Sequence, residues 1–317
     1  MKTKISHSIS VVIPVYNSAD SLQVLIQRIE PVLKSLTAQH ELIFVNDGSK
    51  DNSWQRIQEL CASHPWITGI DLMRNYGQHN ALLCGIRAAR NDIIVTMDDD
   101  LQNPPEEIPK LIAKLMEAYD VVYGTPEKEQ HGFWRDRASQ ISKLILQESM
   151  GAETARKASA FRAFRKDVRA AFDNYQSAYV SIDVLLTWGT TKFTAISVRH
   201  DTRQIGASND SFGKLVTHAM NMMTGFSTLP LQLASLMGFA ITFFGFCVLV
   251  YVVGRYFIQG ASVPGFAFLA SIISIFAVAQ MFSLGIMGEY LARMHSRSMG
   301  RPPSVVRDTV GLLNRKD

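Results

Sequence analysis

Short apolar runs alternate with amphipathic helical patterns over the first 125 residues of the chain. The predicted strands are Ile9–Val15, Glu41–Val45, Ile67–Leu72, Asp92–Met97 and Asp120–Tyr123. The predicted helices between them are Ser21–Lys34, Asn52–Ser63, Gln78–Arg90 and Glu106–Tyr119. Strands that alternate with helices are typical of βαβ units with right-handed crossovers. The pattern therefore predicts an α/β domain built on a parallel sheet.

The pattern is less regular after residue 126. We expect helices at Phe133–Met150, Asp167–Asn174 and Tyr179–Trp188, and strands at Ala158–Phe164 and Phe193–His200. Ser211–Thr224 has one apolar face, formed by Phe212, Leu215, Val216, Ala219 and Met223. An amphipathic helix of this kind is expected to lie along a membrane surface.

Two long uncharged segments follow. Arg255 is the only Asp, Glu, Lys or Arg between Leu215 and Gly288. Within this region, Leu231–Val253 and Phe266–Gly288 are each long enough to cross a hydrocarbon core of about 30 Å. The alternative is a pair of buried core helices, but such helices rarely run this far without a charged face. We therefore expect two membrane spans.

Charge predicts the orientation of these spans. The outer flanks of the pair are basic, with Lys214 before it and Arg293, Arg297, Arg301 and Arg307 after it. The positive-inside rule then places both termini on the cytoplasmic side of a multi-pass membrane protein, and any catalytic machinery before the spans lies on that side as well. The apolar run Ile9–Val15 is too short for a signal peptide. The whole chain has 32 Lys and Arg against 28 Asp and Glu, a formal charge of +4, which is too weak to indicate nucleic-acid binding.

These features divide the chain into four parts. We expect a cytoplasmic catalytic domain over residues 1–210, an amphipathic juxtamembrane helix over 211–228, two spans within 229–290, and a basic cytoplasmic tail over 291–317. Cys61, Cys84 and Cys247 are widely spaced and lack metal-ligand spacing, as expected of free thiols in a reducing compartment. The sequence leaves the oligomeric state open, and an oligomer formed through the spans is compatible with it.

Polar segments follow four of the predicted strands in succession. These segments are Pro14–Asn17, Asn46–Ser49, Arg74–His79 and Asp98–Asp100. In parallel sheets, ligands bind beyond the carboxyl ends of the strands. We therefore expect the four segments to meet at one edge of the sheet and to form a binding site there.

The three carboxylates Asp98, Asp99 and Asp100 indicate a divalent cation. Clustered carboxylates repel one another, and hard cations such as Mg²⁺ or Mn²⁺ bind oxygen ligands and often bridge to substrate phosphates. The alternative is a solvated acidic turn. Asp47 could accept a hydrogen bond from a base or a ribose, or it could form an ordinary Asp-Gly turn. The GxGxxG and GxxxxGK[ST] fingerprints are absent, which argues against a nicotinamide enzyme or a P-loop ATPase.

Four motifs taken together resemble the family 2 glycosyltransferases with the A-type nucleotide-sugar fold. The motifs are Val11–Asn17, Val45–Ser49, Arg74–His79 and Asp98–Glu106. The resemblance is to the polyprenyl-phosphate glycosyltransferases, a subgroup that includes dolichol-phosphate mannose synthase, bactoprenol glucosyltransferases and undecaprenyl-phosphate formamido-arabinose transferase. It continues through two C-terminal spans that end in Gly288–Arg293 and covers roughly residues 9 to 307. Arg74–His79 and Leu101–Pro109 look most like the formamido-arabinose branch.

This resemblance implies a donor site, a metal site and an acceptor site. The residues implied in nucleotide-sugar binding are Pro14, Tyr16, Asn17, Asp47, Asn75, Gly77, Asp98 and Asp99. Among these, Asp47 would recognise the base. Asp98, Asp100 and Gln102 would hold Mg²⁺ or Mn²⁺ on the diphosphate of a nucleotide sugar, with a UDP-sugar as the expected donor. The residues implied at the acceptor phosphate are Arg135, Arg137, Ser139, Arg162, Arg203 and Gln204. Asp98, Asp100, Arg162 and Arg203 are the expected catalytic residues.

The implied reaction is an inverting transfer of one sugar to undecaprenyl phosphate. A lipid phosphate is already anionic, so its oxygen can attack the sugar without a strong general base, and cations are needed to offset phosphate–phosphate repulsion. Each candidate cation could instead face solvent or lipid headgroups, and a structural role for His79 is favoured over a catalytic one. The product would feed a cell-envelope glycan or lipopolysaccharide modification.

The chain also departs from the family pattern. Ser18 and Asn209 stand where the family usually has Glu and Lys, and Pro126-Glu127 replaces basic residues. The acidic residue often found before the Arg-bearing strand is missing from Lys157–Ala160. These changes leave the sugar open. A processive polysaccharide synthase is disfavoured because its Gln-x-x-Arg-Trp motif is absent. A non-enzymatic membrane scaffold is disfavoured because Asp98 and Asp100 are retained.

Overall fold

The computed structural model describes residues 6–126, 157–177, 179–201, 229–259 and 266–311. The chain forms two compact units. One contains residues 1–219 together with 300–317, and the other contains residues 220–299. The two units are described separately below.

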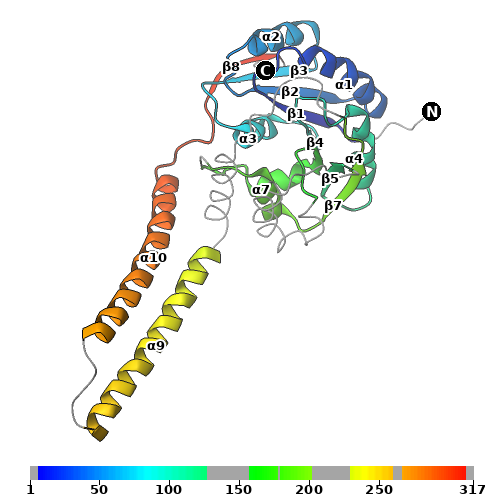
Figure 1. The fold of residues 1–317 in the computed structure, drawn as a ribbon. Helices are drawn as coiled ribbons and strands as arrows, with labels where there is room; N and C mark the ends of the chain where they lie inside the picture. The colour runs from blue at the N-terminus through cyan, green and yellow to red at the C-terminus, as the bar shows by residue number, and fades with distance from the viewer. Residues whose placement is uncertain (1–5, 127–156, 178, 202–228, 260–265, 312–317) are drawn as a thin grey trace. The chain divides into compact units, whose positions relative to one another are not determined.

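The first half of the larger unit has the predicted alternation of strands and helices (Figure 1). Strands β1 (Ile9–Val15), β2 (His40–Asn46), β3 (Ile67–Leu72) and β4 (Ile93–Thr96) are parallel. Helices α1 (Leu22–Leu36), α2 (Ser53–Ser63) and α3 (Gln78–Ala88) connect them. The helix expected at Glu106–Tyr119 is shorter. It consists of a 3₁₀ turn, η1 (Pro105–Glu107), followed by α4 (Ile108–Leu115).

The second half adds a strand of opposite direction. Strand β6 (Arg162–Arg165) is antiparallel to both β4 and β5 (Val121–Pro126), so the sheet is mixed rather than purely parallel. Strand β7 (Phe193–Val198) pairs in parallel with β5. The segment expected to be helical after Asp167 is a 3₁₀ turn, η2 (Lys166–Ala171), and α7 (Ile182–Gly189) follows it.

The C-terminal segment differs from the basic tail that we expected over residues 291–317. Helix α10 continues to Ser298, and β8 (Val306–Gly311) then joins the sheet antiparallel to β3. Over the described residues, the sheet therefore has eight strands in the order β7-β5-β6-β4-β1-β2-β3-β8. The segment Val306–Gly311 is short and lacks a clear alternation of apolar and polar residues, so the sequence did not predict a strand there.

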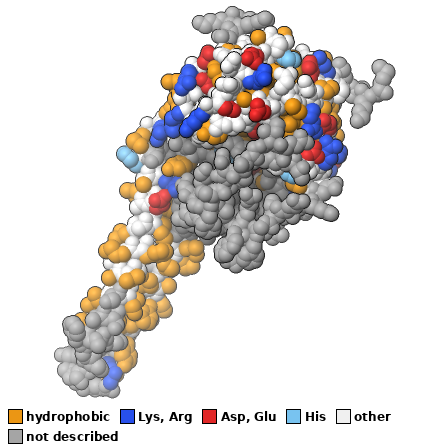
Figure 2. Space-filling model, turned by 45° about the horizontal axis from the view of Figure 1, so that its top comes forward, with side chains coloured by type: hydrophobic (Ala, Val, Ile, Leu, Met, Phe, Trp, Pro, Cys, Tyr) orange, Lys and Arg blue, Asp and Glu red, His pale blue; other side chains and the backbone are white. Residues whose placement is uncertain are grey.

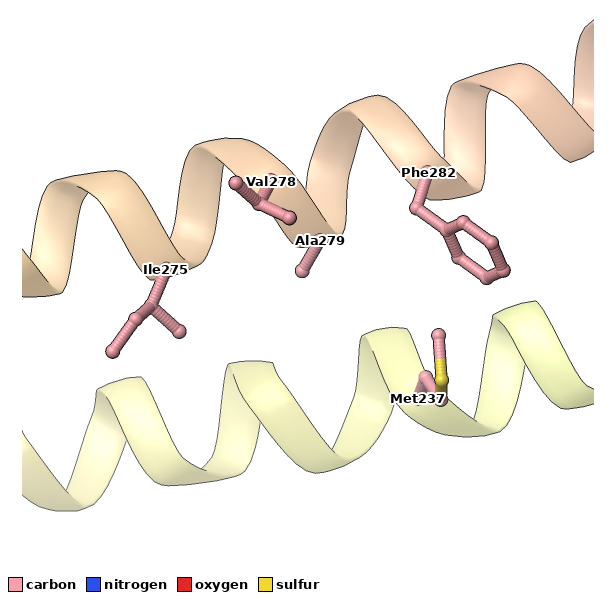
Figure 3. Close-up of a pocket in the computed structure, with 5 residues that line it drawn as sticks. All are labelled: Met237, Ile275, Val278, Ala279 and Phe282. Carbon is pink, nitrogen blue, oxygen red and sulfur yellow. The ribbon is translucent and has the colours of Figure 1, made fainter.

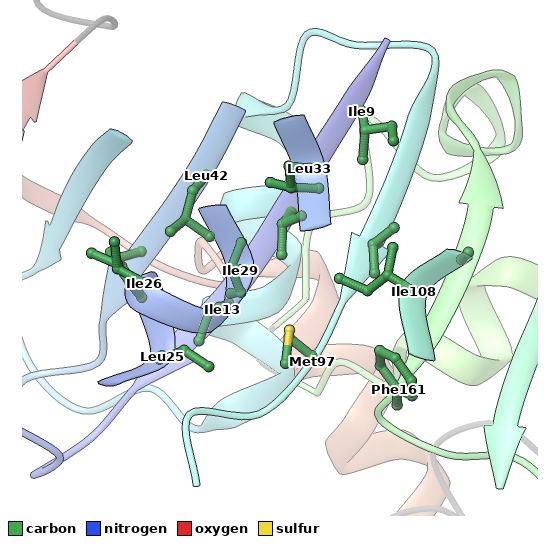
Figure 4. Close-up of a cluster of buried hydrophobic side chains, with 14 of the residues drawn as sticks. Ile9, Ile13, Leu25, Ile26, Ile29, Leu33, Leu42, Met97, Ile108 and Phe161 are labelled. Atoms are coloured by element: carbon green, nitrogen blue, oxygen red, sulfur yellow. The ribbon is translucent and has the colours of Figure 1, made fainter. Parts of the chain in front are cut away.

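One buried apolar cluster holds the helices on the sheet. Side chains of α1 such as Leu25 and Ile29 pack against Ile13 and Leu42 of the central strands (Figure 4). Met97, which follows β4, belongs to the same cluster and is 1% exposed. The backbone that leads into the acidic segment is therefore fixed by core packing, because closely packed interiors resist displacement.

The strand directions bring many chain segments to one edge of the sheet. β1 to β4, β5 and β7 all end there, and the antiparallel strands β6 and β8 begin there. The pairs Thr96–Arg162 and Leu72–Val306 mark this edge. We call it the carboxyl edge.

The described part of the smaller unit consists of two long apolar helices, α9 (Leu229–Gln259) and α10 (Phe266–Ser298). Leu231–Arg255, with a mean hydropathy of 2.4, and Ile275–His295, with 1.4, are long and apolar enough to cross a membrane. Large apolar side chains such as Phe239 and Phe257 are exposed, unlike those of a soluble core helix, and Figure 2 shows hydrophobic side chains along the pair. These findings agree with the two predicted spans.

The two helices pack against each other through small and apolar residues. A side chain at Gly245 of α9 would come within 2.6 Å of the ring of Phe276 of α10. A small residue at this position lets the helices approach closely, as is common in membranes. Beside this contact lies an apolar groove of about 500 Å³, lined by Met237, Ile275, Val278, Ala279 and Phe282 (Figure 3).

Candidate active site

The turns after β1 and β2 are bonded to each other at the carboxyl edge. Asn17, with φ 55°, adopts the left-handed conformation that Asn tolerates better than most residues. Its backbone N–H donates to Oγ of Ser49 over 3.0 Å, and its Oδ1 accepts the N–H of Lys50 over 2.8 Å. The structure therefore brings the predicted site residue Asn17 to the turn that carries Asp47.

Asp47 holds the loop that follows β3. Its two carboxylate oxygens accept the backbone N–H groups of Tyr76 and Gly77 over 2.7 and 2.8 Å. Burial raises the pKa of Asp47, whereas these two bonds and the nearby Arg74 lower it. Asp47 is 3% exposed. The geometry shows an anchoring role for Asp47, and its contact with a base stays a prediction.

Gly48 allows this loop to lie close to the turn after β2. Its φ is +66°, and a Cβ there would lie 2.5 Å from the backbone N of Asn75. Only glycine fits both the conformation and the space. The predicted residues Asp47, Asn75 and Gly77 are thus brought together through backbone contacts.

Aromatic side chains lie at the same edge. The guanidinium of Arg74 stacks over the ring of Tyr76 at 4.2 Å. Tyr16, which follows β1, is 40% exposed although its neighbour Pro14 is buried in the strand. Exposed aromatic rings are surfaces on which a planar base can stack.

The carboxylate of Asp98 is held by a neighbouring helix. Its Oδ1 accepts a hydrogen bond of 2.6 Å from Nε2 of Gln78, the first residue of α3. Burial, and then repulsion from Asp100 and Asp99, raise the pKa of Asp98 to about 7, against the opposing effects of Arg162 and Gln78. A metal-free site would therefore bind a proton near neutral pH.

Asp99 and Asp100 are engaged in different ways. Asp99 Oδ2 accepts the backbone N–H of Tyr16 over 3.4 Å, so this carboxylate faces the turn after β1. Asp100 Oδ1 accepts the N–H of Gln102 over 3.1 Å. Leu101, which lies between Asp100 and Gln102, has φ 61°, a strained conformation for a branched side chain. Such strain is often found at functional sites.

The described residues contain no group of three or more His, Cys, Asp or Glu side chains placed to hold a metal ion by themselves. Two carboxylates are nevertheless a suitable partial set, because Mg²⁺ is commonly bound by one or two carboxylates together with substrate phosphates. The mutual repulsion that raises the pKa of Asp98 is what a cation would relieve. Asp98 and Asp100 therefore fit a divalent cation shared with a phosphorylated ligand.

Arg162 is buried at the start of β6. It is 1% exposed, and its Nη1 donates to Oδ1 of Asp183 over 2.5 Å. The hydroxyl of Tyr123 donates to the same oxygen over 3.0 Å. Nε of Arg162 is buried and has no hydrogen-bond partner among the described residues. Arg162 pairs with Thr96 in the sheet, two residues before Asp98, and its charge lowers the pKa of Asp98.

Tyr123 and Asp183 were missed in the sequence analysis. Asp183 lies in the first turn of α7, where an acidic residue is commonly explained by the helix dipole. Tyr123 lies in a strand, where the sequence pattern indicates a core residue. Their contact with Arg162 depends on three elements that are separate in sequence, so no local pattern indicates it.

His79 has a structural contact, as favoured from the sequence. Its Nδ1 accepts the backbone N–H of Ile182 over 3.3 Å, which links the start of α3 to the start of α7. Five of the predicted acceptor residues, Arg135, Arg137, Ser139, Arg203 and Gln204, lie outside the described residues and stay predictions. The helices expected at Phe133–Met150 and Ser211–Thr224 also lie outside them.

The sequence matches the family description "Glycosyl transferase family 2" over residues 10–172. The chain belongs to this family, and it is a glycosyltransferase. It is 34% identical over 307 residues to undecaprenyl-phosphate 4-deoxy-4-formamido-L-arabinose transferase of Serratia proteamaculans (strain 568), covering 96% of this chain and 94% of that protein. The protein of the same name from Yersinia pestis (strain Pestoides F) is 36% identical, with the same coverage. The family expected from the four motifs is confirmed.

Solved structures confirm the expected fold. Glucosyl-3-phosphoglycerate synthase from Mycobacterium tuberculosis, crystallised with Mn²⁺, UDP-glucose and phosphoglyceric acid, superposes with a TM-score of 0.51 at 18% identity. The match covers 69% of this chain and 78% of that one. The family 2 glycosyltransferase has an A-type nucleotide-sugar fold, followed by two helices that suit a membrane.

Proposed function

We propose that the chain transfers one sugar from a nucleotide diphosphate sugar to undecaprenyl phosphate, with inversion at the anomeric carbon. The observation that carries the proposal is the placement of Asp98, Asp100 and buried Arg162 together at the carboxyl edge. The printed names of relatives that match along 96% of the chain support this acceptor. The transferred sugar is left open by the departures at Ser18 and Asn209.

We propose that Asp98 and Asp100, with Gln102, hold Mg²⁺ or Mn²⁺ on the donor diphosphate. When bound, the cation would act as a Lewis acid and neutralise the charge that develops on the leaving diphosphate. Asp99 would remain outside the metal's ligands, since its Oδ2 faces the Tyr16 backbone. A UDP-sugar is the preferred donor, which is supported by the UDP-glucose in the structural neighbour.

On this proposal, the donor base lies between the turns after β1, β2 and β3. Tyr16 and Tyr76 offer aromatic surfaces, and Asp47 orders the backbone N–H groups of the loop around them. Pro14, Asn17, Asn75 and Gly77 shape the wall of this pocket. These roles follow from the residues' positions at the carboxyl edge and are tested by substitution.

The acceptor phosphate needs positive charge more than it needs a base. Its oxygen is anionic near neutral pH and attacks carbon while the C–O bond to the donor diphosphate breaks, so no proton has to be removed. Arg162 supplies a fixed, buried guanidinium, which Asp183 and Tyr123 orient. Arg135, Arg137, Ser139, Arg203 and Gln204 are the further candidates for this phosphate.

The two apolar helices support a membrane acceptor, because both are long and apolar enough to cross a membrane. The chain reaches α9 after β7 and returns from α10 into β8. We propose that the enzyme lies in the inner membrane with its catalytic unit and both termini in the cytoplasm, on the basis of the flanking Arg and Lys residues.

The test uses the purified full chain with undecaprenyl phosphate, Mn²⁺ or Mg²⁺, and a panel of UDP-, GDP- and dTDP-sugars. We expect one donor class to yield a lipid-linked monosaccharide, chelation to abolish turnover, and Asp100→Ala to abolish it as well. Absence of product with every donor would refute the proposed acceptor. Full turnover by Asp100→Ala would refute the metal assignment.

A further inference from the structure

Two segments that are far apart in sequence meet beyond the acidic turn. The backbone N–H of Asp201 donates to the carbonyl of Gln102 over 2.9 Å. His200 Nδ1 and Asn103 Oδ1 lie 3.4 Å apart. The residues after β7 therefore contact the stretch that follows Asp100 directly.

One side chain from a third element joins both segments. Arg28 of α1 binds Glu106 bidentately, with Nε at 3.0 Å from Oε1 and Nη2 at 2.8 Å from Oε2. The same Nη2 lies 3.7 Å from Oδ2 of Asp201. Bidentate pairs fix direction as well as distance, because the planar guanidinium matches the carboxylate.

Arg199 completes an alternating arrangement of charges. Its Nε lies 3.1 Å from Oδ1 of Asp201, and its Nη2 lies 3.9 Å from Glu106. The hydrogen bond and charge of Glu106, followed by the charge of Asp201, raise the pKa of Arg28. Arg28 lowers the pKa of Glu106. We call Arg28, Glu106, Arg199 and Asp201 the edge ion cluster.

The edge ion cluster is poorly suited to a role in stability alone. Its members are partly solvated, with side-chain exposures of 23% for Arg28, 45% for Glu106 and 28% for Asp201. Ion pairs of this kind typically contribute about 0–1 kcal/mol. Its position is more specific: it joins α1, the exit of the acidic turn and the end of β7.

We propose that Arg28 is a positioning residue for the acidic turn, and through it for the metal and the donor diphosphate. By holding Glu106 and Asp201 together, it fixes the acidic turn against the end of β7. The turn carries the carboxylates proposed to hold the metal and the donor diphosphate. This inference rests on the proposed function, and it adds a positioning residue on α1 that lies outside the proposed metal ligands.

The test compares Arg28→Ala and Arg28→Lys with a matched control, Arg56→Ala. Arg56 also pairs with a glutamate, Glu59 at 2.9 Å, on the exposed surface of α2. We expect Arg28→Ala to weaken Mn²⁺ binding in the presence of UDP by about tenfold, the lower range for residues that orient metal ligands. We expect Arg28→Lys to be intermediate and Arg56→Ala to bind Mn²⁺ as tightly as the wild type does.

A double-mutant cycle then tests whether Arg28 couples Glu106 to Asp201. Glu106→Gln and Asp201→Asn should be non-additive in their effect on Mn²⁺ binding when Arg28 is present and additive in the Arg28→Ala background. If Arg28→Ala shifts only the thermal midpoint and binds Mn²⁺ as tightly as Arg56→Ala does, the positioning role is refuted. Mn²⁺ binding in the presence of UDP can be measured without an acceptor. If the wild type made no lipid-linked sugar, the proposed function would be refuted, and the Mn²⁺-binding test of Arg28 would still decide the positioning role.

Discussion

The side-chain amide of Gln78 donates a hydrogen bond of 2.6 Å to Oδ1 of Asp98. Gln78 is the first residue of α3, and the loop before it is held by Asp47 through the N–H groups of Tyr76 and Gly77. The bond therefore connects the loop proposed for the donor base with the carboxylate proposed for the metal. An amide donor orients the carboxylate without adding charge, and it leaves Oδ2 for a cation.

Gln78→Ala should weaken Mn²⁺ binding by about 10- to 100-fold, as for other residues that orient a metal ligand. The affinities of the wild type and of Gln78→Ala can be measured by titration calorimetry with UDP present. Equal affinity of the wild type and Gln78→Ala would show that this bond does not support the metal site.

The raised pKa of Asp98 predicts a pH dependence in the metal-free protein. The folded-state pKa of about 7 lies above the ordinary value of 3.8, so folding favours the protonated carboxyl. This contribution to stability is fully present below pH 3.8 and is lost as pH rises through about 7. We expect Asp98→Asn to lower the dependence of the thermal midpoint on pH between these values.

Metal binding should show the opposite trend over the same range. A cation needs the ionised carboxylate, so protons compete with Mn²⁺ below the pKa of Asp98. The stabilisation by added Mn²⁺, measured as the increase in thermal midpoint, should therefore grow from pH 6 to pH 8. A stabilisation that is independent of pH would place the metal away from Asp98.

The buried pair of Arg162 and Asp183 predicts an unequal response to two substitutions. Asp183→Ala leaves a buried guanidinium without its carboxylate and should cost about 3–5 kcal/mol of unfolding free energy. Tyr123→Phe removes one hydroxyl donor but keeps the ion pair, so it should cost only about 1 kcal/mol. Denaturant unfolding compares the two.

Activity adds a second measurement to this comparison. If Asp183 orients Arg162 toward the acceptor, Asp183→Asn should raise the KM for undecaprenyl phosphate even where the variant remains folded. Tyr123→Phe serves as the control, with a small effect on both quantities. An unchanged acceptor KM in folded Asp183→Asn would assign the pair to stability alone.

The sequence predicted the parts of this protein that are encoded locally. The strands β1 to β4 follow from apolar runs, and their polar ends meet at one edge because parallel strands share a direction. The antiparallel strands β6 and β8 could not be placed in this way. Arg162 pairs with Thr96, and Val306 pairs with Leu72, so each partner comes from a distant part of the chain.

The same distinction holds for the candidate site. Asp98, Asp100 and Asp47 stand in recognisable turns, whereas the contacts of Asp183 and Arg28 arise only from tertiary packing. Their residue types gave no signal, since an acidic residue in a first helical turn and an arginine on an amphipathic helix are both common on protein surfaces.

Gly48 offers a test of how closely the donor loop must approach the turn after β2. Gly48→Ala introduces a methyl group 2.5 Å from N of Asn75 and 2.6 Å from C of Arg74, at a φ of +66°. The left-handed conformation alone costs a non-glycine residue about 1–2 kcal/mol. The backbone clash must also displace the loop that Asp47 holds. We therefore expect lower stability together with weaker binding of UDP.

Gly300→Ala is the matched control for this substitution. Gly300 has φ +61°, but nothing lies within 4 Å of a Cβ placed there. It should therefore show the conformational cost without a clash, and UDP binding should stay at the wild-type level. The difference in unfolding free energy between Gly48→Ala and Gly300→Ala measures the cost of the clash between the new methyl group and the backbone of Asn75. If Gly48→Ala binds UDP as tightly as Gly300→Ala does, the loop from Arg74 to Gly77 is not part of the donor site.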